Sequence, residues 1–166
     1  HQYYFNDSSV EIFRDTGAEI GPFSRVEGGV IPVGIAATES ALNILNKVYF
    51  LGRTKDNLLG IVEIDATNYS IVSTPDFVQR VDDYLNYDDA FAWSDTHNGH
   101  SFYNITFPNV ELSAGFGTNL GKTWSYDVMT KLWFERTSYI SSESRETRHV
   151  ANCSMFLNGK QLIGTF

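Results

Sequence analysis

Two kinds of hairpin alternate along the chain, and both are visible in the order of its apolar and polar positions. The first kind begins at an Asp, continues into an apolar stretch and ends at a Thr; it covers residues 7–16, 65–74 and 127–137. The second kind turns at an Asn and continues into an apolar pair; its turns centre on Asn46-Lys47, Asn98-Gly99 and Asn158-Gly159. Each kind recurs at intervals of about 50 to 60 residues, close to the period of a kelch-type blade.

Two alternating hairpins per period make a four-stranded unit, and radially repeated four-stranded sheets are the blades of a β-propeller. The pattern therefore predicts a mainly β fold built of propeller-type blades. Two units are complete, and a half unit stands at each end, which gives about three blade equivalents. Since closed propellers have about four to eight blades, we expect residues 1–166 to form a single partial propeller, as a fragment of a longer chain or a ring completed by another copy.

One helix interrupts the strands. Pro75 suits the first turn of a helix, and Ser73 and Thr74 before it are good capping residues. Apolar side chains then recur at helical spacing on one side, from Phe77 to Leu85, while the intervening positions are polar. The pattern predicts a helix over about residues 75–85 that packs across the end or side of a blade.

The remaining segments divide into hairpins and connections. Residues 17–40 are rich in Gly and predict a connection between blades with one short strand near 30–33. Residues 108–121 read as an insertion, and such surface loops often carry contacts, as we also expect of a 143–148 loop. The expected hairpins are 41–51, 60–74, 90–107, 123–137 and 149–165.

The composition describes a globular, acidic chain. Apolar residues make up 42% and aromatic residues 14% of the sequence, which is enough for a core. The net charge of −8 disfavours non-specific binding to the DNA backbone, because phosphate contacts need Lys and Arg; the cluster at 145–149 is the one basic candidate. A single cysteine allows no internal disulfide, and no apolar run is long enough to predict a membrane span.

Two histidine pairs are candidates for chemistry, and neither has a complete set of partners in the sequence. His97 and His100 flank the Asn-Gly turn, with Asp95 nearby, but a zinc site needs three or four ligands. His149 and Cys153 lie four residues apart on an expected strand, without a third group to orient them. We therefore expect turn and strand roles for the histidines, a core position for Cys153, and no catalytic, cofactor or metal site.

The recurring carboxylates are better explained by turns than by catalysis. Asp7, Asp65 and Asp127 begin equivalent hairpins, and an Asp at a turn start accepts a hydrogen bond from the backbone two residues on. A unique active site would break this repetition. The sequence also has no phosphate-binding or dinucleotide-binding glycine motif. Four aromatic residues could form a sugar-binding platform, but strand alternation divides them between the blade interface and its exposed face: Trp124, Tyr126, Trp133 and Phe134.

Several segments together resemble one protein family. They are DDAFAWSDTHNGHSFYNITFP at 88–108, KTWSYDVMTKLWFERTS at 122–138, RHVANCSMFLNGKQLIG at 148–164, DSSVEIFRDTG at 7–17 and NKVYFLGR at 46–53. In this order they resemble the packaged-DNA stabilisation proteins, or tail accessory factors, of short-tailed (podoviral) phages and prophages. The match is poor over 17–40, 54–70 and 109–121, and Thr165 stands where family members commonly carry Asp.

The resemblance implies a structural role rather than an enzymatic one. Such proteins form a hub or plug between the portal and the tail needle, assemble late in the bacterial host cytoplasm and stabilise packaged DNA in the virion head. The family implies six copies in the virion tail, with the portal-attached adaptor ring and the tail needle as partners, and neither a membrane nor sequence-specific nucleic-acid binding.

Two other functions remain open from the sequence. One is a propeller-type glycan-binding or glycosidase domain, which as an enzyme needs two convergent carboxylates about 5–10 Å apart. The other is a kelch-like protein-interaction domain, which shares the blade pattern without the phage-like segments. The fold alone does not separate these functions, because function depends on sites.

Overall fold

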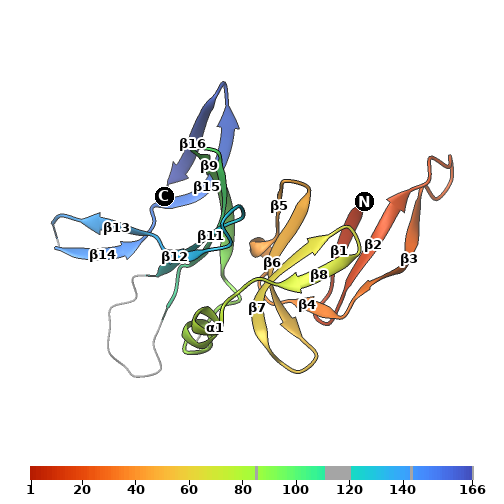
Figure 1. Ribbon diagram of the computed structural model, residues 1–166, viewed down its shortest axis with the longest axis horizontal. Coiled ribbons are helices and arrows are strands. Elements are labelled where there is room, and N and C mark those ends of the chain that lie inside the picture. The colour runs from red at the N-terminus through yellow and green to blue at the C-terminus, as the bar shows by residue number, and fades with distance from the viewer. Residues whose placement is uncertain (85, 111–120, 143, 166) are drawn as a thin grey trace.

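The computed structural model describes residues 1–84, 86–110, 121–142 and 144–165. Within these ranges the chain is mainly β, with one α-helix and one short 3-10 turn, η1 (Thr38–Ser40). Antiparallel sheets stand side by side along the longest axis, with the N-terminal sheet at one end and the C-terminal hairpins at the other (Figure 1). No helix in the described ranges has the length and apolarity needed to cross a membrane.

The central sheet is a complete blade with one additional strand, in the order β4-β6-β7-β8 with β5 paired to β6. Its strands are β4 (Val33–Ile35), β5 (Leu42–Ile44), β6 (Lys47–Thr54), β7 (Leu59–Asp65) and β8 (Asn68–Ile71). The β5–β6 turn consists of Leu45 and Asn46, both with positive φ as a type I′ turn requires. The predicted turn at Asn46-Lys47 is thus wrong by one residue, while the predicted hairpins are confirmed.

The next sheet repeats the four-stranded plan in the order β12-β11-β10-β9. Its strands are β9 (Phe91–His97), β10 (His100–Phe107), β11 (Lys122–Asp127) and β12 (Trp133–Glu135). Asn98 and Gly99 both have positive φ and join β9 to β10, as predicted. Two hairpins of alternating kind therefore form one blade.

The N-terminal sheet has the order β1-β2-β3, with β1 (Gln2–Phe5), β2 (Val10–Asp15) and β3 (Phe23–Ile31). The nine-residue β3 contradicts the prediction that residues 17–40 are mostly a connection. Gly28 and Gly29 do not end the strand: Gly28 has positive φ, and the β2–β3 register shifts beside it, so the pair forms a bulge within the strand. The strand was not predicted because the Gly-rich composition of residues 17–40 is typical of a loop.

Two further hairpins form the C-terminal end. One contains β13 (Thr137–Ile140) and β14 (Arg145–Arg148), and the other β15 (Ala151–Leu157) and β16 (Lys160–Thr165). The second hairpin turns at Asn158-Gly159, as predicted. The predicted 143–148 loop is wrong, because residues 145–148 are β14. A strand of three charged residues and one threonine lacks the apolar period that would reveal it.

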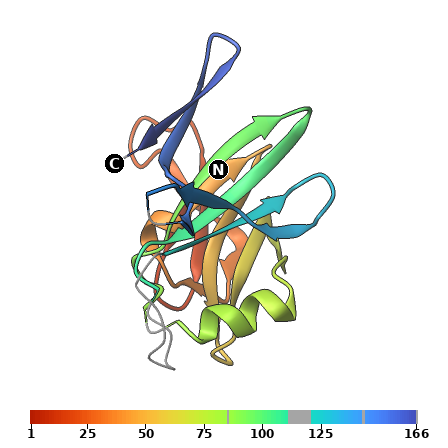
Figure 2. The ribbon, with the colours of Figure 1, turned by 90° about the vertical axis from the view of Figure 1, so that its left-hand side faces the viewer.

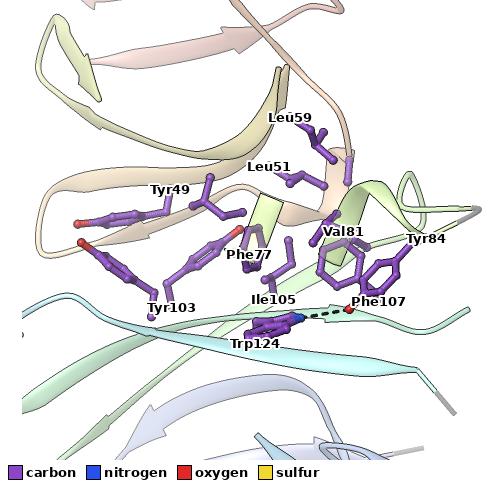
Figure 3. Close-up of a cluster of buried hydrophobic side chains, with 14 of the residues drawn as sticks. Tyr49, Leu51, Leu59, Phe77, Val81, Tyr84, Tyr103, Ile105, Phe107 and Trp124 are labelled. Atoms are coloured by element: carbon purple, nitrogen blue, oxygen red, sulfur yellow. Dashed lines mark hydrogen bonds between the residues drawn. The ribbon is translucent and has the colours of Figure 1, made fainter. Parts of the chain in front are cut away.

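Strands β6 and β7 of the central sheet are buried on both faces, and the alternation of β6 explains how. Tyr49 and Leu51 face β10 and β11 of the next blade, whereas Val48 and Phe50 face the N-terminal sheet. Neighbouring side chains of a strand point to opposite faces, so one strand contributes to two cores. Figure 3 shows the first core, in which Tyr49 and Tyr103 approach each other across the interface.

Helix α1 (Pro75–Asp82) covers one end of the interface between the two blades (Figure 2). The Thr74 hydroxyl accepts a hydrogen bond from the Phe77 N–H, which confirms the predicted cap. The helix ends at Asp82, earlier than the predicted residue 85. Tyr84 still packs inward, and the Trp124 indole N–H donates to its hydroxyl at 3.3 Å (Figure 3).

Candidate assembly surface

Of the three predicted turn carboxylates, Asp127 makes the expected hydrogen bond with the backbone two residues on. Its Oδ1 accepts a hydrogen bond from the Met129 N–H at 2.9 Å, and its Oδ2 accepts from the Thr130 hydroxyl at 2.7 Å. His100 Nδ1 lies 2.7 Å from the same Oδ2. Desolvation acts to raise the pKa of Asp127, but the hydrogen bonds from Thr130, Met129 and His100 outweigh it and lower the pKa to about 2.

The other two recurring carboxylates do not share this turn. Asp65 ends β7 next to a tight turn, and its side chain lies 3.4 Å from Lys47 Nζ. Asp7 lies exposed inside a longer turn, where the Asn6 N–H bonds to the Ser9 carbonyl. The backbone of Asp7 packs against Gly34, where an added Cβ would lie 1.9 Å from the Asp7 oxygen. The prediction of three equivalent turns is therefore wrong.

The histidines at the Asn-Gly turn face each other across the hairpin, as predicted, since His97 and His100 are paired in register. Asp95 does not join them. Its Oδ1 accepts from the Asn104 amide at 2.7 Å and from Arg136 Nη1 at 3.0 Å. No group of three metal-ligating side chains occurs among the residues that the structure describes.

A buried polar layer covers the outer face of the second blade. Asn104 also donates to the Trp93 carbonyl and accepts from Ser125, and Thr106 bonds to Thr123. Arg136 completes the layer by lying over the Trp93 ring, 5.5 Å from its centre. These groups satisfy one another, as buried polar groups must. The carboxylate of Asp95 thus has a structural role, as the acceptor for Asn104 and Arg136.

His149 and Cys153 do not form a pair. His149 precedes β15 and stacks on Trp93 with ring centres 5.0 Å apart, while a register shift between Ala151 and Cys153 interrupts the strand alternation. Burial, with help from the positive charge of Arg136, lowers the pKa of His149. Cys153 is exposed, so the prediction of a core position is wrong in this structure.

Arg148 and His149 of the basic cluster at 145–149 are used in contacts within the chain. The Arg148 guanidinium lies over the Phe91 ring and donates to Asn152 at 3.0 Å, and burial lowers its pKa. The His149 N–H donates to Thr123 in the polar layer. These side chains attach the C-terminal hairpins to the second blade.

Exposed apolar side chains gather on the C-terminal hairpins, which gives the clearest candidate for an assembly surface. We define the C-terminal apolar surface by residues that are each more than 40% exposed: Tyr139, Val150, Met155, Phe156, Leu157, Leu162 and Ile163. Phe156 and Tyr139 are the most exposed, at 64% and 63%. Hairpins at equivalent places in the central blade bury such residues against a neighbour. Large apolar side chains exposed in this number on two neighbouring hairpins are a feature of interaction sites.

Sequence reasoning placed contacts elsewhere and missed this surface. The apolar runs at 155–157 and 162–163 are visible in the sequence, but they are the runs expected of a blade strand buried on both faces. Only the fold shows that their faces are open. The predicted contact insertion at 108–121 lies mostly outside the described residues, at 111–120. The aromatic quartet divides as predicted, with Trp124 and Tyr126 buried and Phe134 exposed.

Comparison with known proteins identifies the family. No curated protein matches the chain significantly. A family model described as bacteriophage P22 Gp10, β-propeller, matches residues 1–164. This match covers nearly the whole chain and agrees with its mainly β structure of antiparallel sheets, which in the described residues are not closed into a ring. The chain therefore belongs to the phage-stabilisation family of bacteriophage P22 Gp10, whose members are β-propeller structural proteins of phages that stabilise packaged DNA.

Proposed function

We propose that this chain is part of the tail hub of a short-tailed phage, where several copies plug the head between the portal and the tail needle and retain the packaged DNA. The family match over residues 1–164 carries this proposal. It supports a structural virion component that works through contacts with other virion proteins. Six copies, the adaptor ring and the needle are the partners that the resemblance implies.

The C-terminal apolar surface supports a role in assembly. Its side chains belong to two hairpins that extend from the second blade (Figure 2), so a partner can reach them without disturbing the cores. Phe156 and Leu157 lie beside the β15–β16 turn, at the tip of one hairpin. Burying such aromatic and aliphatic side chains is the main favourable contribution in most protein association.

The proposal assigns no catalytic role to the chain. Asp95 and Asp127, the carboxylates of the second blade with the most contacts, are held by Arg136, Asn104, Thr130 and the turn backbone. A glycosidase needs a carboxylate free to donate or accept a proton at the substrate. A strongly hydrogen-bonded Asp with a pKa near 2 is a poor proton donor at neutral pH.

Variants made in a phage that encodes this chain test the proposal. Phe156→Asp puts a charge into the C-terminal apolar surface, whereas Ile20→Asp makes the same kind of change at a residue that is 92% exposed in the β2–β3 loop. We expect Phe156→Asp to reduce the amount of the protein in purified tails and to increase the share of heads that lose their DNA. Ile20→Asp should assemble like the wild type.

Two measurements separate the parts of the proposal. Equal incorporation of Phe156→Asp and Ile20→Asp would show that the contact lies elsewhere on the chain. Heads that keep their DNA when the whole protein is absent would contradict the role in retention. Circular dichroism of both purified variants checks that neither change affects folding.

A further inference from the structure

A groove beside helix α1 is separate from the C-terminal apolar surface. It lies between α1, the end of β8 and the β6–β7 turn, and its volume is about 410 Å³. Figure 1 shows α1 and β8 near the middle of the row of sheets, away from the C-terminal hairpins. Sites that bind ligands have volumes of about 300–1,000 Å³ and are mostly apolar. The apolar side chains that line this groove are Leu58, Ile71, Pro75 and Val78.

Helix α1 contributes to the groove with a side that the core does not use. Phe77 and Val81 are buried between the two blades. Pro75, Val78 and Asp82 follow one another at three and four residues, which places them together on another side of the helix. All three line the groove. The helix thus has one side in the core and a second side that faces the groove.

The opposite wall is exposed and includes the edge of a sheet. Leu58 is 48% and Ile71 is 38% exposed, so a partner in the groove would remove apolar surface from water. Ile71 is the last residue of β8, which in the described part of the chain is the outermost strand of the central sheet. Such an edge presents backbone donors and acceptors that an extended peptide can pair with. These walls therefore suit a polypeptide better than a small molecule.

Two carboxylates at the end of α1 give the groove a negative charge. Asp82 and Asp83 line it, at the helix end where the dipole favours cations over anions. Among the described residues, neither carboxylate has a cation within ion-pair distance. Arg80, the basic residue of the last turn, pairs with Asp76 at 3.1 Å instead. A cation supplied by a partner would complement both carboxylates and the helix end.

We propose that this groove binds a short segment of a partner protein in which an apolar side chain stands next to Lys or Arg. The apolar side chain packs against Leu58 and Val78, and the basic side chain pairs with Asp82 and Asp83. This contact goes beyond the proposed function, which assigns assembly to the C-terminal apolar surface, and it does not depend on the location of the chain in a tail.

Selection of peptides tests the chemistry of the partner. A library of random peptides displayed on yeast is first depleted on the purified double variant Asp82→Asn/Asp83→Asn and then selected on the purified wild type. The peptides that remain are those whose binding needs the two carboxylates. We expect them to carry Leu, Ile, Val or Phe next to Lys or Arg.

The affinity of a selected peptide tests the charged part of the groove. Asp82→Asn/Asp83→Asn should weaken binding by about tenfold, as the loss of two exposed ion pairs would. The double variant should unfold at a temperature no lower than that of the wild type, because it removes anions from the end of a helix. Glu19→Gln/Glu27→Gln makes the same change in net charge at two exposed residues of the N-terminal sheet and its β2–β3 loop, and it should bind like the wild type.

A second pair of variants tests the apolar part. Leu58→Ser should weaken binding, whereas Leu132→Ser, at a residue 64% exposed in the β11–β12 turn, should not. The absence of enriched peptides, or enriched peptides without Lys or Arg, would overturn the proposal. Equal weakening by Leu58→Ser and Leu132→Ser would also contradict it, because the contact would then lie outside the groove.

Discussion

At the scale of single residues, identical amino acids at similar places in the sequence have different roles. Asp7, Asp65 and Asp127 all begin hairpins, yet in the described structure Asp127 alone of the three binds the backbone two residues on. The turn lengths differ, and the hydrogen bond depends on the turn. The sequence could predict an Asp in a turn, but the contact between Asp127 and His100 joins residues 27 positions apart and depends on the β10–β11 register.

We expect Asp127→Ala to lower the free energy of unfolding by about 1–3 kcal/mol, because it leaves the Met129 N–H and the Thr130 hydroxyl without an acceptor. Asp7→Ala should change it by no more than about 0.5 kcal/mol, as at most surface positions. Urea unfolding of both variants checks this. Equal losses at the two positions would support the equivalence of turns that the structure contradicts.

A second residue-scale prediction concerns pH. The pKa of His149 in the folded chain is lowered from its ordinary 6.5 by burial and by Arg136. The His149 imidazole is then uncharged in both the folded and the unfolded chain above pH 6.5. As the pH falls below this value, the imidazole binds a proton more tightly in the unfolded chain than in the folded one. We expect stability to fall between pH 7.5 and 5, and His149→Phe, which keeps a ring on Trp93, to lose less over that interval. Denaturant unfolding at the two pH values measures the stability of the wild type and of His149→Phe. If both lose the same stability between these pH values, His149 is not the cause of the loss.

At the scale of elements, a local sequence signal predicted the structure correctly where it is typical of one kind of element only. Asn98-Gly99 and Asn158-Gly159 allow positive φ in both turn positions, and each forms the predicted turn. Elements were missed where one residue type has two roles. Gly28 and Gly29 indicate a loop in the sequence but form a bulge in β3, and β14 was missed because its four residues include no apolar side chain.

The cap of α1 offers a test at this scale. Thr74→Ala removes the acceptor for the Phe77 N–H and should lower the free energy of unfolding by about 1 kcal/mol. Thr74→Ser keeps the hydroxyl and should lose only a small part of this. Phe77→Ala should cost more, about 3–5 kcal/mol, because Phe77 fills the core between the two blades beside Trp124 and Trp133. Thermal unfolding of the three variants should give this order, and a Thr74→Ser loss equal to that of Thr74→Ala would show that the cap is not the cause.

At the scale of the whole molecule, the sheets form an open row in which interior strands are buried and the two ends are not. The period of the hairpins predicted this arrangement, since two complete and two half units leave an incomplete ring. The sequence could not show which faces stay open, because the exposed Phe156 and the buried Phe50 occur in similar apolar runs. Burial depends on the neighbouring blade, which a strand does not specify by itself.

The distribution of charge predicts how the chain meets DNA. The sequence has 20 acidic and 12 basic residues, and several of the basic side chains already have partners: Arg136 with Asp95, Arg80 with Asp76, and Lys47 with Glu63. Binding to duplex DNA requires cations that neutralise phosphates and release counterions. We therefore expect retention of DNA by obstruction rather than by adhesion, which also leaves the strand free to pass when it is ejected.

An electrophoretic mobility assay can decide between obstruction and adhesion. The purified chain should leave duplex DNA unshifted at about 0.15 M salt at concentrations where non-specific binders with Kd of roughly 10⁻⁴–10⁻⁶ M shift it. Lowering the salt should not restore binding, because an acidic surface repels phosphates more strongly when screening weakens. A basic DNA-binding protein run alongside controls for the sensitivity of the assay. Binding that strengthens steeply as salt is lowered would mean that several Lys and Arg contact phosphates, and that the chain holds DNA directly.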